Sequence, residues 1–251
     1  MRLMKRILSA AAVLALSASL LVGCSSGTAS SVPVSASSAA ESTVSSVEET
    51  ASSAVDENEA AAAQLLNDLT GSYQELWPVI LADEYKQTWL DDCTALVGED
   101  NAEAAFEKLS SMVTGDVYGE DAVKAYANGG GAYFCGFTNS LATLTFDGET
   151  STISGTDKDG NVLFSHTYHY IGMEPVRGLY EFESDDADSG EFTYFFLAPD
   201  TSAETYHIEF RYGSDAEALS QYDAGEYAYW LASGISTDCD QTMIDNCIKL
   251  F

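Results

Sequence analysis

The chain has 251 residues, of which 40 are acidic and 10 are basic, so its formal net charge is −30. So acidic a chain is a poor partner for nucleic acid or for an anionic membrane surface, and cations are its natural ligands. Acidity by itself usually reflects only solubility. The charge therefore argues against anionic partners but does not show that the protein binds a cation.

The N-terminus predicts an exported, lipid-anchored protein. Three basic residues among the first six precede a short apolar run, which describes a secretory signal rather than a membrane span. The run ends in Leu21-Val22-Gly23-Cys24, which resembles a bacterial lipobox. We therefore expect residues 1–23 to be a signal peptide and Cys24 to be acylated, the alternative being a chance cysteine behind an ordinary signal.

Residues 24–57 are expected to form a disordered tether. The stretch is rich in Ser, Ala, Thr, Val and Glu and has no aromatic residue. Such a composition cannot bury enough apolar surface to offset the entropy lost on ordering. The anchor and the tether together predict a domain held at the outer face of the bacterial cytoplasmic membrane or in the periplasm.

Residues 58–251 suit one domain, whose first half has helical periodicity. Helices are expected at 59–69, 73–97 with an interruption near Pro78, 101–112 and 120–126.

From residue 132 the period changes to that of a strand meander with Asp-Gly turns. Strands are expected at 141–146, 152–154, 162–170, 179–183, 192–197 and 206–213, followed by a capping helix at 240–251. Six or seven successive antiparallel strands favour a closed or nearly closed barrel, because closure removes exposed edges. The expected fold class is α+β.

The strand at 206–213 carries the most informative side chains. Its alternation places His207, Glu209 and Arg211 on one face and apolar residues on the other. The imidazole and the carboxylate are about 7 Å apart at Cα, a spacing from which both can bind one metal ion. The alternative is a polar pair on a solvated sheet face.

Several motifs, in order, resemble the ZinT (YodA) family of exported, zinc-binding, lipocalin-like proteins. The family's Leu-x-Asp-x-x-Gly-x-Trp-Gln-x-Val-Tyr-Pro pattern matches LNDLTGSYQELWP at 66–78. Its Tyr-x-Tyr-x-Gly and Ala-Pro motifs match 168–172 and 198–199, and its His-x-His strand with the following helix start matches 207–219. The resemblance covers the chain from about residue 66 to the C-terminus, with extra residues around 91–119.

The resemblance implies a lipocalin/calycin-like antiparallel barrel with N-terminal helices and a C-terminal helix. It also implies binding of zinc, or of another divalent transition metal such as cadmium, without enzymatic activity. Scavenging, buffering or delivery of metal to an ABC importer would be the role.

The ligand set departs from that of the family. Glu209 stands at the second histidine of the His-x-His pair, and the third zinc histidine falls on Phe195, which cannot bind metal. The predicted metal ligands are therefore His207 and Glu209, with water, His166 or an acidic side chain completing the shell. His166 shares a strand face with aromatic residues, so it is either this ligand or a packed interior histidine, and His169 is expected to face solvent.

Two further sets of residues leave alternatives open. Cys93, Cys135, Cys239 and Cys247 allow two disulfides in three pairings, or free buried thiols, and we expect Cys239 to pair with Cys247. The acidic segment 185–191 favours a polar hairpin turn over a cation-binding loop.

Catalytic motifs are absent from the sequence: it has no nucleophile elbow, phosphate-binding loop or HExxH helix. Two other functions remain open. One is a lipocalin-like module for a small apolar ligand that has lost tight metal binding, and the other is a metallohydrolase that uses His207, Glu209 and a third group.

Overall fold

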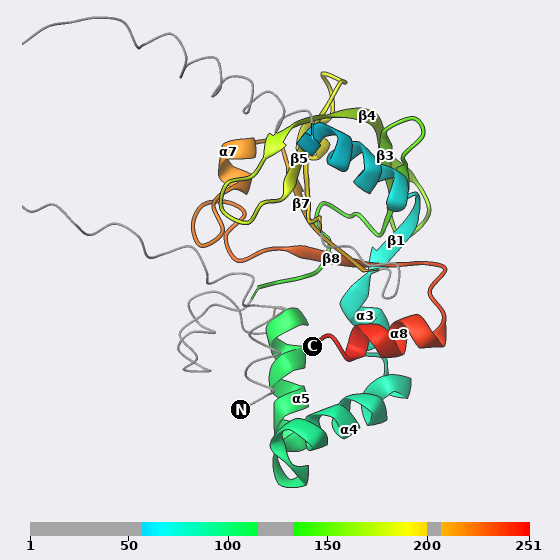
Figure 1. The fold of residues 1–251 in the computed structure, drawn as a ribbon, viewed down its shortest axis with the longest axis vertical. Helices are drawn as coiled ribbons and strands as arrows, with labels where there is room; N and C mark the ends of the chain where they lie inside the picture. The colour runs from blue at the N-terminus through cyan, green and yellow to red at the C-terminus, as the bar shows by residue number, and fades with distance from the viewer. Residues whose placement is uncertain (1–56, 115–132, 200–206) are drawn as a thin grey trace, which may run out of the picture.

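A closed barrel of eight antiparallel strands organises the chain in the computed structural model, which describes residues 57–114, 133–199 and 207–251. Each strand pairs with its neighbours in sequence, and the first strand pairs with the last (Figure 1). The strands are β1 Gly71–Glu75, β2 Thr143–Asp147, β3 Thr152–Thr156, β4 Val162–Met173, β5 Tyr180–Ser184, β6 Tyr194–Leu197, β7 His207–Gly213 and β8 Ala232–Ser236. The expected α+β fold class and the lipocalin-like barrel are thus confirmed.

Helices cover the barrel on more than one side. A helix at 57–68 directs its apolar residues into the barrel's core and so covers one opening. A separate helical layer lies below the barrel in Figure 1. This layer comprises α3 Leu76–Ile80, the 3-10 turn η1 Asp83–Tyr85, α4 Lys86–Val97, α5 Glu99–Thr114 and α8 Gln241–Ile248. The short elements η2 Gly190–Phe192 and α7 Ala216–Leu219 flank β6 and β7.

Aromatic rings fill the described interior of the barrel. Phe164 stacks on Phe192 with ring centroids 4.0 Å apart, and Phe195 lies between Tyr168 and Tyr212 at 5.4 Å from each. These side chains belong to one buried cluster. An interior packed in this way does not favour the alternative function, in which the barrel would hold a small apolar ligand.

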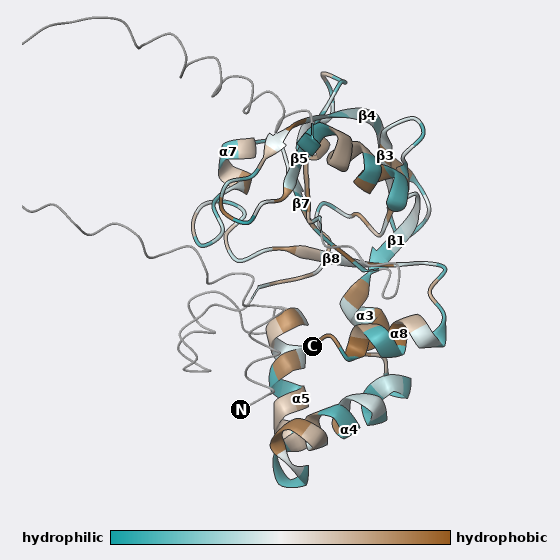
Figure 2. Cartoon of the chain, viewed as in Figure 1, coloured by the Kyte–Doolittle hydropathy of each residue, from teal (hydrophilic) through white to brown (hydrophobic). Residues whose placement is uncertain are grey.

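A second core joins the helical layer to the outside of the barrel. Leu76, Trp77 and Ile80 of α3 pack with residues of α4, α5 and α8 and against Ile235, which points outward from β8. Figure 2 shows hydrophobic residues concentrated in α3 and on part of α5, whereas the more exposed surface of α4 is largely hydrophilic. The outer face of β8 is therefore buried rather than solvated.

The N-terminal strand was not expected. Residues 73–97 were predicted to be one interrupted helix, yet residues 71–75 form β1, and helical structure begins only at Leu76. Tyr73 pairs with Leu144 on one side and with Ser236 on the other, so contacts with distant strands override the local helical pattern. β8 was also missed, because its sequence Ala-Ser-Gly-Ile-Ser has only one large apolar residue.

The other elements agree with prediction within a few residues, except that Phe192 lies in η2 rather than in a strand. The helix expected at 120–126 lies outside the described residues, as do the signal peptide and most of the tether. None of the described helices is long and apolar enough to cross a membrane.

The disulfide expected between Cys239 and Cys247 is wrong, since neither cysteine forms a disulfide in the structure. Cys239 precedes Asp240, the N-cap of α8, and Cys247 lies near the end of that helix. A helix rises about 1.5 Å per residue, so the eight steps between them span about 12 Å, beyond the Cα separation of about 7 Å that a disulfide tolerates.

Candidate metal centre

β7 has one face inside the barrel and one face outside. Ile208, Phe210 and Tyr212 are buried in the barrel core, whereas His207 and Glu209 alternate with them and point outward. The sequence prediction that these two side chains share a face is confirmed. Both are partly buried, because the helical layer and the loops around it cover this part of the outer wall.

Residues on the adjacent strands define the surroundings of this pair. His207 lies opposite Ile235 and Glu209 opposite Ser233 on β8. On the other side, the N–H of Ala198 donates to the backbone oxygen of Glu209. Among the described residues, the pair therefore has an isoleucine side chain, a serine hydroxyl and an alanine methyl group beside it.

Phe195 does not lie on this face. It pairs with Tyr212 and is fully buried inside the barrel. The residue beside Glu209 on this side is Ala198, which directly follows β6 and also offers no metal ligand. β6 therefore contributes no donor side chain at this position.

The structure does not bring His166 together with His207 and Glu209. Its ring stacks on Phe164 at 5.9 Å and lies near Tyr168, both of which are in the barrel core. Its Nδ1 hydrogen-bonds to Asp186 Oδ2 at 2.9 Å. His166 thus faces inward on β4, while the other two residues face outward on β7, so the barrel wall separates them.

His169 points to the other side of β4, as expected for residues three apart on a strand. Its Nδ1 hydrogen-bonds to Asp185 Oδ1 at 2.7 Å, and both side chains are about half exposed. The adjacent residues Asp185 and Asp186 therefore bind one histidine on each face of the strand. The segment that they begin is a turn closed by Ser189, whose hydroxyl donates to the backbone oxygen of Asp186 at 2.7 Å.

Cys135 lies near Glu209, although the sequence suggested only a disulfide or a buried thiol for it. The N–H of Ser233 donates to the backbone oxygen of Cys135, so the segment around Cys135 runs beside β8 at Ser233. Burial and the negative charge of Glu209 raise the pKa of the Cys135 thiol to about 12, although the nearby Ser233 and Trp77 side chains act in the opposite direction. The thiol is therefore neutral, and no sequence motif identified it.

Arg211 completes the outer face of β7 and is fully buried. Its guanidinium donates to the backbone oxygens of Leu219, Gln221 and Tyr227, which ties the segment after β7 to the barrel wall. Burial lowers the pKa of Arg211, but an arginine stays charged at any physiological pH. A fixed positive charge thus lies two residues from Glu209.

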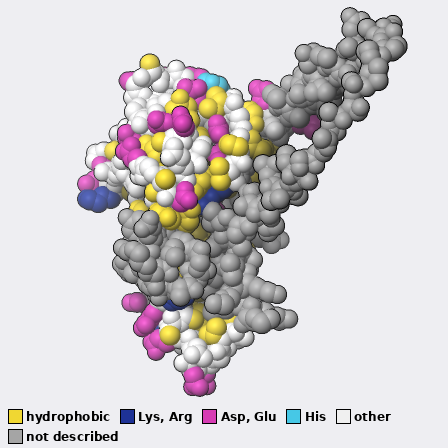
Figure 3. Space-filling view, turned by 90° about the vertical axis from the view of Figure 1, so that its left-hand side faces the viewer, with side chains coloured by type: hydrophobic (Ala, Val, Ile, Leu, Met, Phe, Trp, Pro, Cys, Tyr) yellow, Lys and Arg dark blue, Asp and Glu magenta, His cyan; other side chains and the backbone are white. Residues whose placement is uncertain are grey.

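No group of three or more His, Cys, Asp or Glu side chains within the described ranges is arranged to hold a metal ion. His207 and Glu209 together supply one nitrogen and up to two oxygen donors. Water or another ligand would have to fill the remaining positions. The chain as a whole is strongly acidic, and Figure 3 shows many acidic and few basic side chains on the face that it presents.

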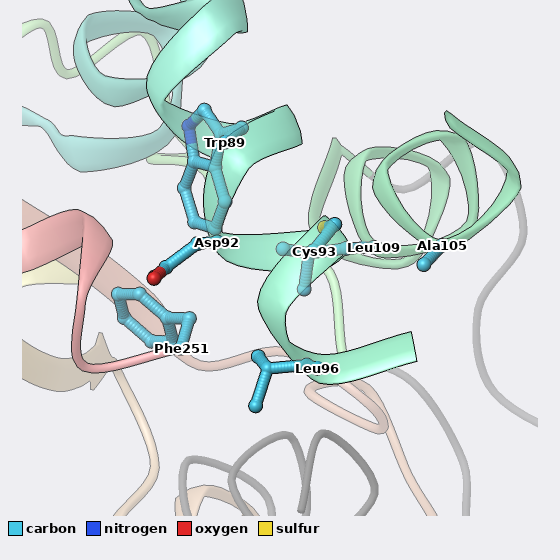
Figure 4. Close-up of a pocket in the computed structure, with 7 residues that line it drawn as sticks. All are labelled: Trp89, Asp92, Cys93, Leu96, Ala105, Leu109 and Phe251. Atoms are coloured by element: carbon cyan, nitrogen blue, oxygen red, sulfur yellow. The ribbon is translucent and has the colours of Figure 1, made fainter. Parts of the chain in front are cut away.

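A small pocket lies in the helical layer rather than in the barrel (Figure 4). Its lining is almost entirely apolar and comes from α4, α5 and the C-terminal residue. The lining residues are Trp89, Asp92, Cys93, Leu96, Ala105, Leu109 and Phe251. Burial, followed by the charge of Asp92, raises the pKa of Cys93, so this thiol is a neutral packing group.

The closed up-and-down barrel with flanking helices defines a lipocalin-like α+β protein. No protein-family model matches the chain, and no curated protein sequence matches it. Among solved structures, the chain is similar to the Zn(II)-bound ZinT-like domain of Streptococcus pneumoniae AdcA, with a TM-score of 0.44 and 17% identity over 72% of this chain and 87% of that domain. It is also similar to Zn(II)-bound AdcA from the same organism, with a TM-score of 0.41 and 15% identity over 72% of this chain and 33% of that protein.

Proposed function

We propose that this chain binds zinc, or a similar divalent metal, as cargo outside the cytoplasm. The observation that carries the proposal is that His207 and Glu209 share the partly buried outer face of β7. An imidazole and a carboxylate are ordinary zinc ligands, and partial burial limits competition from water. The motifs that resemble the ZinT family support zinc as the first metal to test.

The site is expected to be weaker and less selective than one built from three imidazoles. Only one of the two ligands is an imidazole, and carboxylate oxygen accommodates harder cations such as Mn²⁺ and Mg²⁺. Arg211 opposes a cation at Glu209, although its guanidinium is turned toward the carbonyls of Leu219 and Tyr227. Because the barrel wall separates His166 from the pair, and no other described donor side chain joins it, water is the better candidate for the third position.

Location and role form the second part of the proposal. Acylation of Cys24 would anchor the domain through its tether, so that metal is scavenged or buffered at the membrane and passed to an ABC importer. Detergent partitioning of the wild type and of Cys24→Ala tests the anchor. Membrane fractionation of the variant after a salt wash would contradict it.

Zinc titration calorimetry tests the site directly. His207→Ala should bind zinc at least 10–100-fold more weakly than the wild type, since even changes outside the ligand shell have effects of about that size. His169→Ala is the matched control, because this histidine pairs with Asp185 on another strand. Binding should also weaken below about pH 6, where protons compete for the imidazole.

Two outcomes would contradict the proposal in different ways. Equal affinity in the wild type and in His207→Ala would show that the metal binds elsewhere on the acidic surface. No measurable binding in the wild type, with zinc or with cadmium, would remove metal binding altogether.

A further inference from the structure

Buried hydrogen-bond donors without partners gather on the outer wall of the barrel, beside the site proposed for metal. Among the described residues, the buried arginine side-chain atoms that lack a partner are Arg177 Nε, Arg177 Nη2 and Arg211 Nε. All of them are nitrogen donors. Buried polar groups in proteins are normally satisfied, so donors of one kind in one region indicate an acceptor that the chain itself does not provide.

Among these residues, Arg177 has the surroundings that best indicate which kind of ligand it would bind. Its guanidinium lies 3.8 Å from the ring centre of Tyr222 and 4.8 Å from that of Tyr133. Arg211 lies 4.4 Å from the ring centre of the same Tyr222, so cations and rings are packed closely together. These ring contacts use none of the N–H groups of the Arg177 guanidinium.

No carboxylate in the described part of the chain forms an ion pair with this guanidinium. The nearby Glu174 is fully buried, and its two oxygens accept from the backbone N–H groups of Val176 and Arg177, each at 2.7 Å. One of them also accepts from the Tyr222 hydroxyl at 3.2 Å. Within the described ranges, no ion pair or hydrogen bond involves the Arg177 guanidinium, although the chain has 40 acidic residues.

The two unpartnered nitrogens specify the shape of the acceptor. Nε and Nη2 lie on the same edge of the guanidinium and carry parallel N–H bonds, which is the edge that binds a carboxylate through both oxygens. Tyr222 and Tyr133 lie against the guanidinium, so little room remains beside its faces. A planar carboxylate needs room only along the edge, whereas a tetrahedral phosphate also carries oxygens to either side of it.

We propose that Arg177, held by Tyr133 and Tyr222, binds a carboxylate ligand through Nε and Nη2. The residue as a whole is partly exposed, and no hydrogen bond between described residues holds its guanidinium in place. The ligand is the carboxylate of a small organic acid or that of a peptide. This site does not depend on metal binding at His207 and Glu209.

The test is an NMR titration of the purified protein at constant ionic strength, followed through the tyrosine ring resonances. The probes are acetate, the dipeptide Gly-Gly, the amide of that dipeptide and inorganic phosphate. Acetate and Gly-Gly should give saturable shifts, while the amide and phosphate should bind at least tenfold more weakly. The tighter of acetate and Gly-Gly then identifies the source of the carboxylate.

Three variants make the test specific to this site. Arg177→Lys keeps the charge but loses the two-pronged edge, and it should bind acetate at least tenfold more weakly than the wild type. Tyr133→Leu, which keeps Arg177 but removes one ring, should also weaken binding and covers the case in which Arg177→Lys does not fold. Lys158→Gln removes an exposed lysine paired with Asp159 and should bind as the wild type does.

The proposal is overturned if acetate and Gly-Gly produce no saturable shift in the wild type. It is also overturned if Arg177→Lys binds them as tightly as the wild type does, or if phosphate matches acetate.

Discussion

The two faces of β7 have different surroundings and different expected functions. Ile208, Phe210 and Tyr212 face an interior of stacked aromatic rings, whereas His207, Glu209 and Arg211 face outward under loops and helices. In a lipocalin-like barrel the interior is the expected place for a ligand. Here packed side chains fill the described interior. The polar side chains for which we propose binding functions lie on the outer face of the barrel.

The largest expected loss of stability comes from creating a cavity in the interior of the barrel. Phe210→Ala should lower the free energy of unfolding by about 3–5 kcal/mol, because it removes a fully buried ring and leaves a cavity. Urea unfolding followed by circular dichroism measures the change. Thr167→Ala on the exposed face of β4 is the control and should change little. A similar small effect for Phe210→Ala would mean that the interior is not the stabilising core.

Removing the outer guanidinium should have the next largest effect. Arg211→Met should lower the free energy of unfolding by about 2–3 kcal/mol, because it leaves the carbonyls of Leu219, Gln221 and Tyr227 without their donor. Hydrogen exchange should accelerate in the segment after β7 and not in β2 or β3. Uniform acceleration across the barrel would show instead that Arg211 supports the whole fold.

A smaller loss of stability is expected at Gly213, where β7 packs against Tyr227. A Cβ placed on Gly213 would lie 2.6 Å from Cζ of Tyr227, so Gly213→Ala should lower the free energy of unfolding by about 1–2 kcal/mol. A Cβ placed on Gly172 would lie 3.8 Å from Oε2 of Glu181, an ordinary contact, so Gly172→Ala is the matched control in the same unfolding assay. Equal stability of the two variants would mean that Tyr227 does not pack closely on β7.

The smallest effect concerns the neutral thiol. The Cys135 pKa rises from its ordinary 9.0 to about 12 in the folded state, so its contribution to stability is present below pH 9 and is lost as the pH rises toward 12. Cys135→Ser should therefore make the decline in unfolding free energy between pH 9 and pH 11 less steep. Urea unfolding at several pH values measures the slope, and an unchanged slope would place Cys135 in a more solvated environment.

Features that depend on neighbouring residues could be predicted from this sequence, whereas features that depend on contacts between distant residues could not. The alternation around His207 and Glu209 correctly placed both on one face, because strand period is a local property. β1 was not recognised, because Tyr73 lies in a strand only through pairing with residues far along the chain. The third position could not be assigned either, since counting along β6 to Phe195 led to the inside of the barrel.

The carboxylate site proposed at Arg177 could not have been found from sequence. Tyr133, Arg177 and Tyr222 belong to three segments that are distant in the chain and come together only because the barrel positions their loops. No spacing rule connects them. The unpartnered nitrogens of Arg177 became visible only once burial and hydrogen bonds were known for each atom.

Pairing of β1 with β8 has a consequence for how the domain forms. Gln74 pairs with Ile235, so the barrel can close only after nearly the whole chain is available, and contacts this distant in sequence slow folding. Until then β1 and β7 each have an unpaired edge, which is open to pairing with other chains. A chain that stops before residue 232 is therefore expected to aggregate rather than to yield a smaller folded barrel.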